Sequence, residues 1–316
     1  MTKLFDVICI GAALVDMVAQ VKRHPENDDE VFVSDLKLLS GGAAANTAYA
    51  CAKLGLETAF IGKLGRGDTF GSKILKDFNE VKVNIDLIKY SDEFKTGSAY
   101  VALNERGDRR IYAHSGAANY LLGDDIKEDE IGLTKIIFLS SLKNLDPFIK
   151  AAELGKRSKI PVVLNPGMLI IEQGLNEIRN LLEKIDILIL SQREFHFLFD
   201  LKENNFNFDL LHQNVQFFFS LGIKTVVITK GNKGAVILTP DNKELVLPAT
   251  VEKVIDTTGA GDAFSAGFIY GFIQNPSNKF EDLKNYVKIG NFVAGRCIEK
   301  LGARNGIPDR EEINLI

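Results

Sequence analysis

Residues 136–165 read IIFLSSLKNLDPFIKAAELGKRSKIPVVLN. The apolar runs at 136–140 and 162–165 have the length and residue types of buried strands. Between them, residues 147–157 carry apolar side chains at helical spacing. A strand, a helix and a second strand in this order predict a βαβ unit, whose two strands run parallel.

The same alternation extends outward along the chain. Further buried strands are predicted at 7–11, 59–62, 187–191 and 226–229, and helices at 43–54, 70–78, 175–184 and 210–221. The fold class is therefore α/β, with a mostly parallel sheet that helices cover on both faces. Ligands of such sheets bind at the carboxyl ends of the strands, so the polar residues that end these runs are candidates for a site.

Two regions interrupt the alternation. Residues 19–39 contain Val31-Phe32-Val33 without room for a long helix. Residues 97–114 have the pattern of a β-hairpin, with a polar turn at 104–108. We expect both regions to form a small inserted sheet that acts as a lid over a site. Ordinary surface hairpins are the alternative.

Composition restricts the class of function. The 316 residues carry a net charge of −4, which argues against a nucleic-acid binder. No apolar run approaches the roughly 20 residues that cross a bilayer, and Asp6 interrupts any signal peptide, so we expect no membrane contact and a cytoplasmic protein. Cys9, Cys51 and Cys297 lie far apart in apolar stretches, which predicts buried, reduced thiols and no zinc site or disulfide framework.

The most informative motif is Asp256-Thr257-Thr258-Gly259-Ala260-Gly261-Asp262-Ala263-Phe264-Ser265-Ala266-Gly267. It opens a helical pattern that runs through Phe272, and its small residues allow a tight turn. Amides at a helix start are free to bind an anion, as phosphoryl transfer requires. Asp262 follows directly and can accept a proton from an attacking hydroxyl. The alternative is a glycine-rich turn with an ordinary acidic residue near a helix N-terminus.

A second motif, Gly41-Gly42-Ala43-Ala44-Ala45-Asn46, also leads into a helix. Two glycines let the backbone lie against a ligand, and Asn46 can both donate to and accept from a sugar hydroxyl. A glycine-containing loop before a packed helix is the alternative. Gly55 and Gly65 lie beyond this helix start.

Together the two motifs resemble the signatures of the ribokinase-like carbohydrate kinases, the pfkB family. The resemblance covers residues 7–308 and implies a three-layer α/β/α fold with a lid. On this basis we expect a single domain, 1–316, with lid segments at about 17–39 and 96–115. Members of this family often dimerise through the lid, so a homodimer is implied.

The resemblance also assigns roles to residues. Asp262 matches the catalytic base, and Gly259, Ala260 and Gly261 match the anion hole. Asp16, Gly41, Gly42 and Asn46 match residues that contact substrate hydroxyls. Asp256 and Thr258 match residues beside a monovalent cation such as K⁺.

The ATP side is implied in the same way. Val226-Val227-Ile228-Thr229-Lys230-Gly231-Asn232-Lys233-Gly234 resembles the nucleotide-binding loop, so Thr229, Gly231 and Gly234 are expected near ATP, with Asn291 lining the adenine pocket. The family carries Asn-x-x-Glu near Mg²⁺, whereas this chain has Ser191 and Glu194. We expect Glu194 to hold Mg²⁺ through water, and the replacement leaves the role of Ser191 open.

The expected activity is ATP-dependent phosphorylation of a hydroxyl on a small sugar, either a hexose, a ketose or a sugar acid, with Asp262 as base. A nucleoside kinase of the same family is the alternative, and the substrate stays open. A non-catalytic sugar-binding protein would be expected to lose the base or the anion hole. A dinucleotide oxidoreductase is disfavoured because no GxGxxG follows the first strand.

Overall fold

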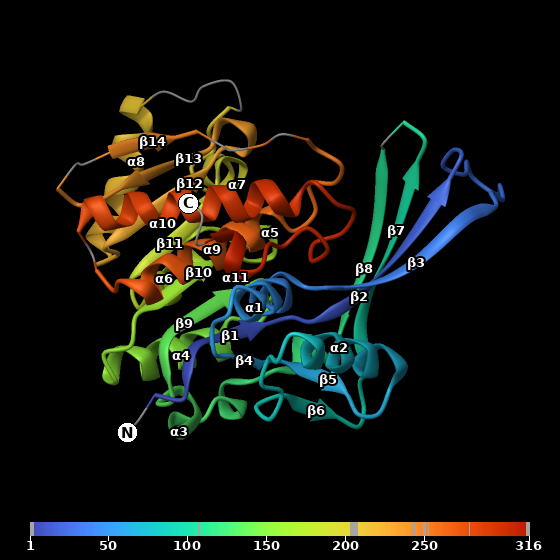
Figure 1. Cartoon of the computed structure of the whole chain (residues 1–316), viewed down its shortest axis with the longest axis horizontal. Helices are drawn as coiled ribbons and strands as arrows, with labels where there is room; N and C mark the ends of the chain where they lie inside the picture. The colour runs from blue at the N-terminus through green and yellow to red at the C-terminus, as the bar shows by residue number, and fades with distance from the viewer. Residues whose placement is uncertain are drawn as a thin grey trace.

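The computed structural model describes residues 3–106, 108–202, 208–241, 244–248, 251, 253–277 and 279–313. Gly107, in the predicted hairpin turn, lies outside this part of the chain. Two bodies of structure are visible in Figure 1, a large layered one and a slender sheet that projects from it.

The main sheet lies at the centre of the large body. Within the described residues it has eight strands in the order β14-β13-β12-β11-β10-β9-β1-β4. The neighbouring pairs from β12 through β11, β10, β9 and β1 to β4 are all parallel. At the other edge, β13 pairs antiparallel with β12, and β14 pairs antiparallel with β13. Their bounds are β1 Phe5–Gly11, β4 Thr58–Ile61, β9 Thr134–Ser140, β10 Val162–Asn165, β11 Ile187–Ser191, β12 Thr225–Thr229, β13 Ala235–Leu238 and β14 Glu244–Leu247.

Helices cover both faces of this sheet, so the predicted three-layer arrangement is confirmed (Figure 1). Alternate residues of β1 point to opposite faces: Val7 and Cys9 join one apolar cluster, and Ile8 and Ile10 join the other. The helices on the first face are α1 Ala43–Lys53, α2 Thr69–Glu80, α9 Ala260–Gln274, α10 Phe280–Cys297 and α11 Arg310–Ile313. Those on the second are α3 Glu128–Ile131, α4 Asp146–Arg157, α5 Met168–Ile171, α6 Leu175–Leu182, α7 Gln192–Leu198 and α8 Phe208–Ser220.

The projecting sheet is the predicted lid. Its order is β3-β2-β7-β8, with β2 and β7 parallel and the outer pairs antiparallel. The strands are β2 Leu14–Val21, β3 Val33–Gly41, β7 Thr96–Asn104 and β8 Arg109–Gly116. The sheet therefore begins a few residues before the predicted segment, and β3 leads through Gly42 directly into α1.

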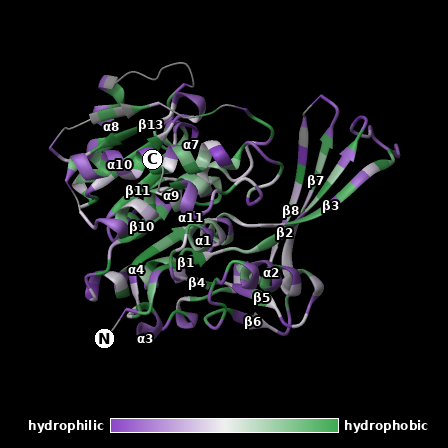
Figure 2. Cartoon of the chain, viewed as in Figure 1, coloured by the Kyte–Doolittle hydropathy of each residue, from purple (hydrophilic) through white to green (hydrophobic). Residues whose placement is uncertain are grey.

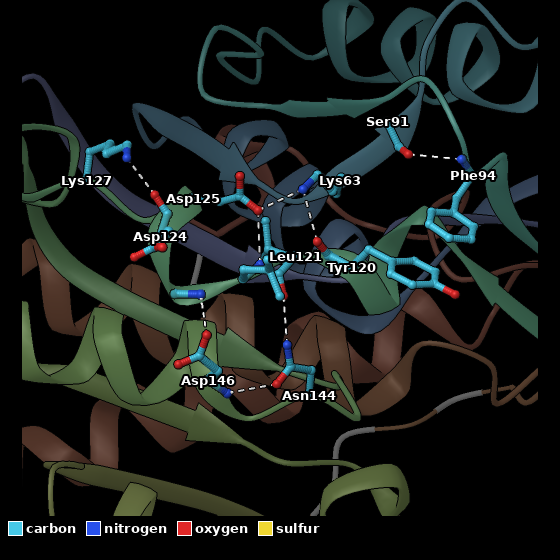
Figure 3. Close-up of polar contacts among 12 residues, drawn as sticks. Lys63, Ser91, Phe94, Tyr120, Leu121, Asp124, Asp125, Lys127, Asn144 and Asp146 are labelled. Atoms are coloured by element: carbon cyan, nitrogen blue, oxygen red, sulfur yellow. Dashed lines mark hydrogen bonds and ion pairs between the residues drawn. The ribbon is translucent and has the colours of Figure 1, made fainter.

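A polar network fixes the chain where it returns from the lid to the main sheet (Figure 3). Lys63, on β5 (Lys63–Gly65), donates to the Tyr120 carbonyl at 3.0 Å and to Asp125 at 2.9 Å. β5 pairs with β6 (Lys89–Ser91), and the Phe94 and Tyr120 rings stack at 3.5 Å. The two short 3₁₀ turns that follow β8, Ala117–Tyr120 and Gly123–Asp125, are thereby anchored to the body.

Apolar residues concentrate in the main sheet, and some remain exposed on the lid (Figure 2). Large exposed apolar side chains on or beside lid strands are Phe32, Val33, Leu36, Leu38, Ile111 and Tyr112.

The three cysteines, Cys9, Cys51 and Cys297, are free and buried, as predicted. No helix in the described part of the chain is long and apolar enough to cross a bilayer.

Helices α9 and α10 approach each other closely through glycines. A Cβ built on Gly267 would lie 2.8 Å from the Cα of Gly290, nearer than real Cβ contacts permit. Phe268 and Tyr286 then meet edge to face beside this contact, with ring centroids 5.5 Å apart. The position of α9, which carries the Asp262 motif, therefore depends on the absence of side chains at these two glycines.

We expect Gly267→Ala to lower the free energy of unfolding by roughly 1–3 kcal/mol, because the helices must separate to admit the methyl group. Equilibrium urea denaturation measures this change. Gln274→Ala, at an exposed position of the same helix, is the control and should change stability by less than about 0.5 kcal/mol. Equal effects of the two changes would contradict the proposed role of the close contact.

Candidate active site

The carboxyl ends of the central strands lie together along one edge of the main sheet. Gly11 of β1 and Asn165 of β10 both align with Ser140 of β9. On the neighbouring strands, Ser191 of β11 aligns with Thr229 of β12. The polar residues that end the predicted strands therefore lie in a row along this edge of the main sheet.

The Asp256–Gly267 motif forms the start of α9. Gly259 is the N-cap and has φ of +77°, a left-handed conformation that favours glycine. The first amides of a helix have no partner in a preceding turn and can bind an anion. Here the Ala260 amide donates to the Thr257 carbonyl at 3.3 Å. Around Gly261 the space is open, since a Cβ there would meet nothing within 4 Å.

A strand end supports this first turn. The Ser265 hydroxyl donates to the Gly261 carbonyl at 2.9 Å, and the Asn165 amide donates to the Ser265 oxygen at 3.0 Å. The end of β10 is thereby joined to the predicted anion hole. Sequence reasoning did not assign a role to Asn165 or Ser265.

Asp262 is held by α1, the helix of the second motif. The Asn46 Nδ2 atom donates to Asp262 Oδ2 at 2.9 Å. The Thr47 hydroxyl lies 3.3 Å from the Asp262 backbone carbonyl and donates to it. The two motifs, 216 residues apart, therefore meet through the side chains of Asn46 and Asp262.

Arg304 joins this pair from the loop that follows α10. Its Nε atom donates to Asn46 Oδ1 at 2.9 Å, and its side chain is buried. Sequence reasoning missed Arg304, because an arginine between Ala303 and Asn305 in a polar stretch is typical of a solvated loop. No spacing pattern near it indicates burial.

The site is electrostatically unusual because several acids are gathered in it. Burial raises the pKa of Asp262 to about 7, against the opposing effects of the Asn46 hydrogen bond and the Arg304 charge. Burial also raises the pKa of Asp16 to about 6, again opposed by Arg304. The pKa of Glu194 is raised by burial as well. A raised carboxyl pKa near neutrality is what a general base requires.

One cavity, of about 400 Å³, lies between the lid and the loops that precede α9 and follow α10. Asp16, Asp256 and Thr258 line it. A Cβ on Gly41 would collide with the Asp16 carboxylate, so the glycine leaves room for that side chain. Gly42, with φ of +93°, is the N-cap of α1 and turns the chain into Asn46. Of the four predicted acceptor residues, Asp16 lines this cavity, whereas Gly41, Gly42 and Asn46 are not among its lining residues.

A second cavity, of about 230 Å³, takes in the predicted nucleotide residues. Thr229, Gly231, Gly234 and Asn291 line it together with Ala260 and Gly261 of the predicted anion hole. Both cavities are lined by Val254 and Thr257. The Asn291 amide donates to the Pro248 carbonyl at 2.9 Å, which fixes its side chain at the cavity wall.

Ser191 and Glu194 form a capping box at the start of α7. Glu194 Oε2 accepts from the Ser191 amide at 2.6 Å, and the Ser191 hydroxyl accepts from the Glu194 amide at 3.2 Å. One carboxylate oxygen is thus used to cap the helix. No cluster of three or more metal-ligating side chains occurs among the described residues.

Asp256 holds the loop before α9. Its Oδ1 atom accepts from the Thr258 amide and hydroxyl at 3.0 and 2.7 Å, and its Oδ2 accepts from the Gly302 amide at 2.8 Å. Because both carboxylate oxygens hold the loop, a cation beside it would bind mainly to backbone carbonyls.

Comparisons with known proteins agree with this geometry. The model of the pfkB family carbohydrate kinases matches residues 4–310. An uncharacterized sugar kinase of Archaeoglobus fulgidus is 34% identical over 81% of this chain and 97% of its own. A ribokinase of Staphylococcus aureus is 31% identical over 98% of this chain and 99% of its own.

Solved structures are similar over the full length. The structure of Arabidopsis thaliana ribokinase complexed with ribose and ATP superposes with a TM-score of 0.87 at 26% identity, covering 100% of this chain and 98% of that one. The fold is also that of a nucleoside kinase from Methanocaldococcus jannaschii, with a TM-score of 0.81 at 24% identity over 100% of this chain and 98% of that one. The chain belongs to the pfkB family of carbohydrate kinases, with a ribokinase-like fold.

Proposed function

We propose that this kinase transfers the γ-phosphoryl group of ATP directly to a hydroxyl of a small sugar, with Asp262 as the base. The observation that carries the proposal is the position of Asp262. It stands at the N-terminus of α9, directly after Ala260 and Gly261, which line the 230 Å³ cavity, and it is bonded to Asn46. That cavity shares Val254 and Thr257 with the cavity that Asp16 lines. ATP and acceptor would therefore meet at this carboxylate.

The reaction follows from that arrangement. The acceptor hydroxyl gives its proton to Asp262 as its oxygen bonds to the γ-phosphorus, and the bond from that phosphorus to the β-bridging oxygen breaks to release ADP. Amides of Gly259, Ala260 and Gly261 would stabilise the charge on the transferred group. Asp16 and Asn46 would orient the acceptor by hydrogen bonds.

The metal side of the proposal rests on Glu194. With Oε2 in the capping box, Oε1 remains available to hold a water of a hydrated Mg²⁺, which fits an ion that keeps several waters. Bound Mg²⁺ would supply charge neutralisation on the phosphates. The loop of Asp256 and Thr258 has backbone carbonyls suited to a monovalent cation such as K⁺.

The lining of the acceptor cavity favours a sugar as the leading candidate substrate and a nucleoside as the second. Asp16 offers a carboxylate for hydroxyl groups, as a sugar requires. The lid side of the cavity is apolar, and its lining residues there are Val18, Leu39, Val101, Leu103 and Ile111. This apolar wall favours a nucleoside as the second candidate, because a base would bury against it. An assay with ATP, Mg²⁺ and a panel of pentoses, hexoses, sugar acids and nucleosides separates the two.

The lid also supports a homodimer. Exposed apolar side chains such as Phe32, Leu36 and Tyr112 lie on or beside its strands, where a second copy could cover them. We further propose that the whole chain acts as one domain, since the lid strands arise from insertions between elements of the main sheet.

Asp262→Asn should lower the turnover number by roughly 10²- to 10⁴-fold, because the amide cannot accept the proton. The affinity for ATP, measured by calorimetry, should stay close to that of the native protein. Near-native turnover in the variant would overturn the assignment of the base.

Asp16→Ala should raise the KM of the acceptor by roughly 10- to 100-fold, because a hydrogen bond to a charged group is lost. The KM of ATP should change by much less. Asp35→Ala, at an exposed position of the lid, is the control and should leave both constants unchanged. Equal changes in the two KM values of the Asp16 variant would place this residue elsewhere.

Asp262→Asn should also stabilise the protein at alkaline pH. The folded-state pKa of about 7 lies above the ordinary 3.8, so the protonated carboxyl stabilises the fold below 3.8, and this contribution is lost as pH rises through 7. At pH 8 the variant should be more stable by on the order of 2 to 4 kcal/mol, and the difference should vanish toward pH 4. Urea denaturation across this range measures it, and a constant difference would contradict the titration of Asp262.

A further inference from the structure

Arg304 is a charged residue whose side chain is buried, and this burial requires an explanation. Its side chain is only 8% exposed, and its guanidinium lies between the rings of Tyr49 and Phe78, 5.1 and 5.6 Å from their centroids. Removing a guanidinium from water is costly unless its donors are satisfied. The neighbouring rings replace only part of that hydration.

The hydrogen bonds of Arg304 are incomplete. Nη1 and Nη2 are buried without a hydrogen-bond partner in the described structure, and the nearest carboxylate oxygen, Asp77 Oδ2, lies 4.0 Å from Nη1. Asp77 is already bonded to Ser40 at 2.5 Å and to Lys73 at 3.1 Å. The Asp77 charge has the largest effect among those that raise the pKa of Arg304, but at 4.0 Å it leaves both Nη atoms without a hydrogen bond.

The one hydrogen bond of the Arg304 guanidinium in the described structure, from Nε, connects it through Asn46 to Asp262. Its Nε atom donates to Asn46 Oδ1, and Asn46 Nδ2 donates to Asp262 Oδ2, each at 2.9 Å. An arginine can only donate, whereas an amide has one accepting and one donating end. Arg304 thus fixes which end of Asn46 faces the carboxylate.

We infer that Arg304 is a positioning residue, which holds the Asn46 amide with its N–H directed at Asp262 and supplies positive charge to an otherwise acidic site. The inference rests on the proposed role of Asp262 as the base. It concerns an interaction that exists before ATP or acceptor binds.

The charges around Asp262 explain why a cation is needed. Glu194 from α7 and Asp16 from β2 both raise its pKa, and the Cys297 thiol of α10 also interacts with it. Arg304 opposes them, and although burial lowers its own pKa to about 10, it stays charged at neutral pH. Without this charge Asp262 would remain protonated to higher pH and would not accept a proton.

The competing explanation is that Arg304 only packs the C-terminal loop against α1 and α2. The variant Arg304→Met distinguishes a packing role from a positioning role. Methionine keeps an apolar side chain beside Tyr49 and Phe78 but has neither a charge nor a hydrogen-bond donor. Replacement of a buried charge by an apolar residue of similar volume is often tolerated. Lys73→Met is the matched control, since it removes a positive charge from the other side of Asp77 without touching Asn46.

The experiment is a titration of the protein without ATP or acceptor. Carboxyl ¹³C NMR of aspartate-labelled protein gives the pKa of Asp262, whose signal is assigned by its loss in Asp262→Asn. Arg304→Met should raise this pKa by roughly one to three units, and Lys73→Met should leave it nearly unchanged. An Asp262 pKa that is the same in Arg304→Met and the native protein would overturn the inference.

A second measurement needs no change at Arg304. The Nε–H signal of Arg304 should shift with pH at the midpoint of Asp262 in the native protein. In Asp262→Asn this step should be lost, which leaves only a smaller shift at the midpoint of Asp16, near 6. A flat signal in both proteins would refute the link through Asn46, even if Arg304→Met failed to fold.

Activity gives a separate result. In Arg304→Met, turnover at pH 6.5 should fall roughly tenfold for each unit by which the Asp262 pKa rises, and it should recover toward the native value as pH rises through the new pKa. A loss independent of pH would show a purely structural role. An inactive native protein with the expected titrations would refute the proposed function but not the link from Arg304 to Asp262.

Discussion

The hydrogen bond between Asn46 and Asp262 is the interaction on which the rest of the site depends. It joins the first turns of α1 and α9, which the chain places 216 residues apart. A carboxylate at a helix N-terminus gains from the helix dipole, but here it also lies near Asp16 and Glu194. The hydrogen bond from Asn46 fixes the position of the Asp262 carboxylate among these acids. The packing of α9 on α10 in turn fixes the position of α9.

The same contact ties the proposed reaction centre to the lid. Only Ala12 and Ala13 separate β1 from β2, and β3 leads through Gly42 into α1. Asp16, on β2, and Asn46, on α1, therefore lie at the two ends of a single hairpin of the lid. A movement of the lid on acceptor binding would act directly on the two residues that face Asp262. At the other side of the lid, Lys63 anchors the chain that follows β8 through Tyr120 and Asp125.

The sequence was sufficient for the fold and for the local parts of the site. Buried strands such as β9 and β10 are continuous apolar runs, and their βαβ spacing determines a parallel arrangement. Gly42 and Gly259 can also be predicted from the sequence, because their positive φ angles are local properties of the turns before α1 and α9. What could not be predicted are residues whose role depends on long-range contact. Arg304 belongs to a polar stretch without a pattern. Asn165 ends an apolar run, which makes it a site candidate but does not reveal its partner. Only the folded chain brings these residues to Asn46 and Ser265.

Ser191 shows how one residue can serve the fold while altering the site. Serine and asparagine are both favoured N-caps, so the start of α7 and its capping box with Glu194 do not require the asparagine usual in the family. The serine side chain is shorter, and its oxygen is already used to accept from the Glu194 amide. It therefore reaches less far toward any ligand at the end of β11. Serine at this position therefore keeps the capping box that presents Glu194 at the start of α7.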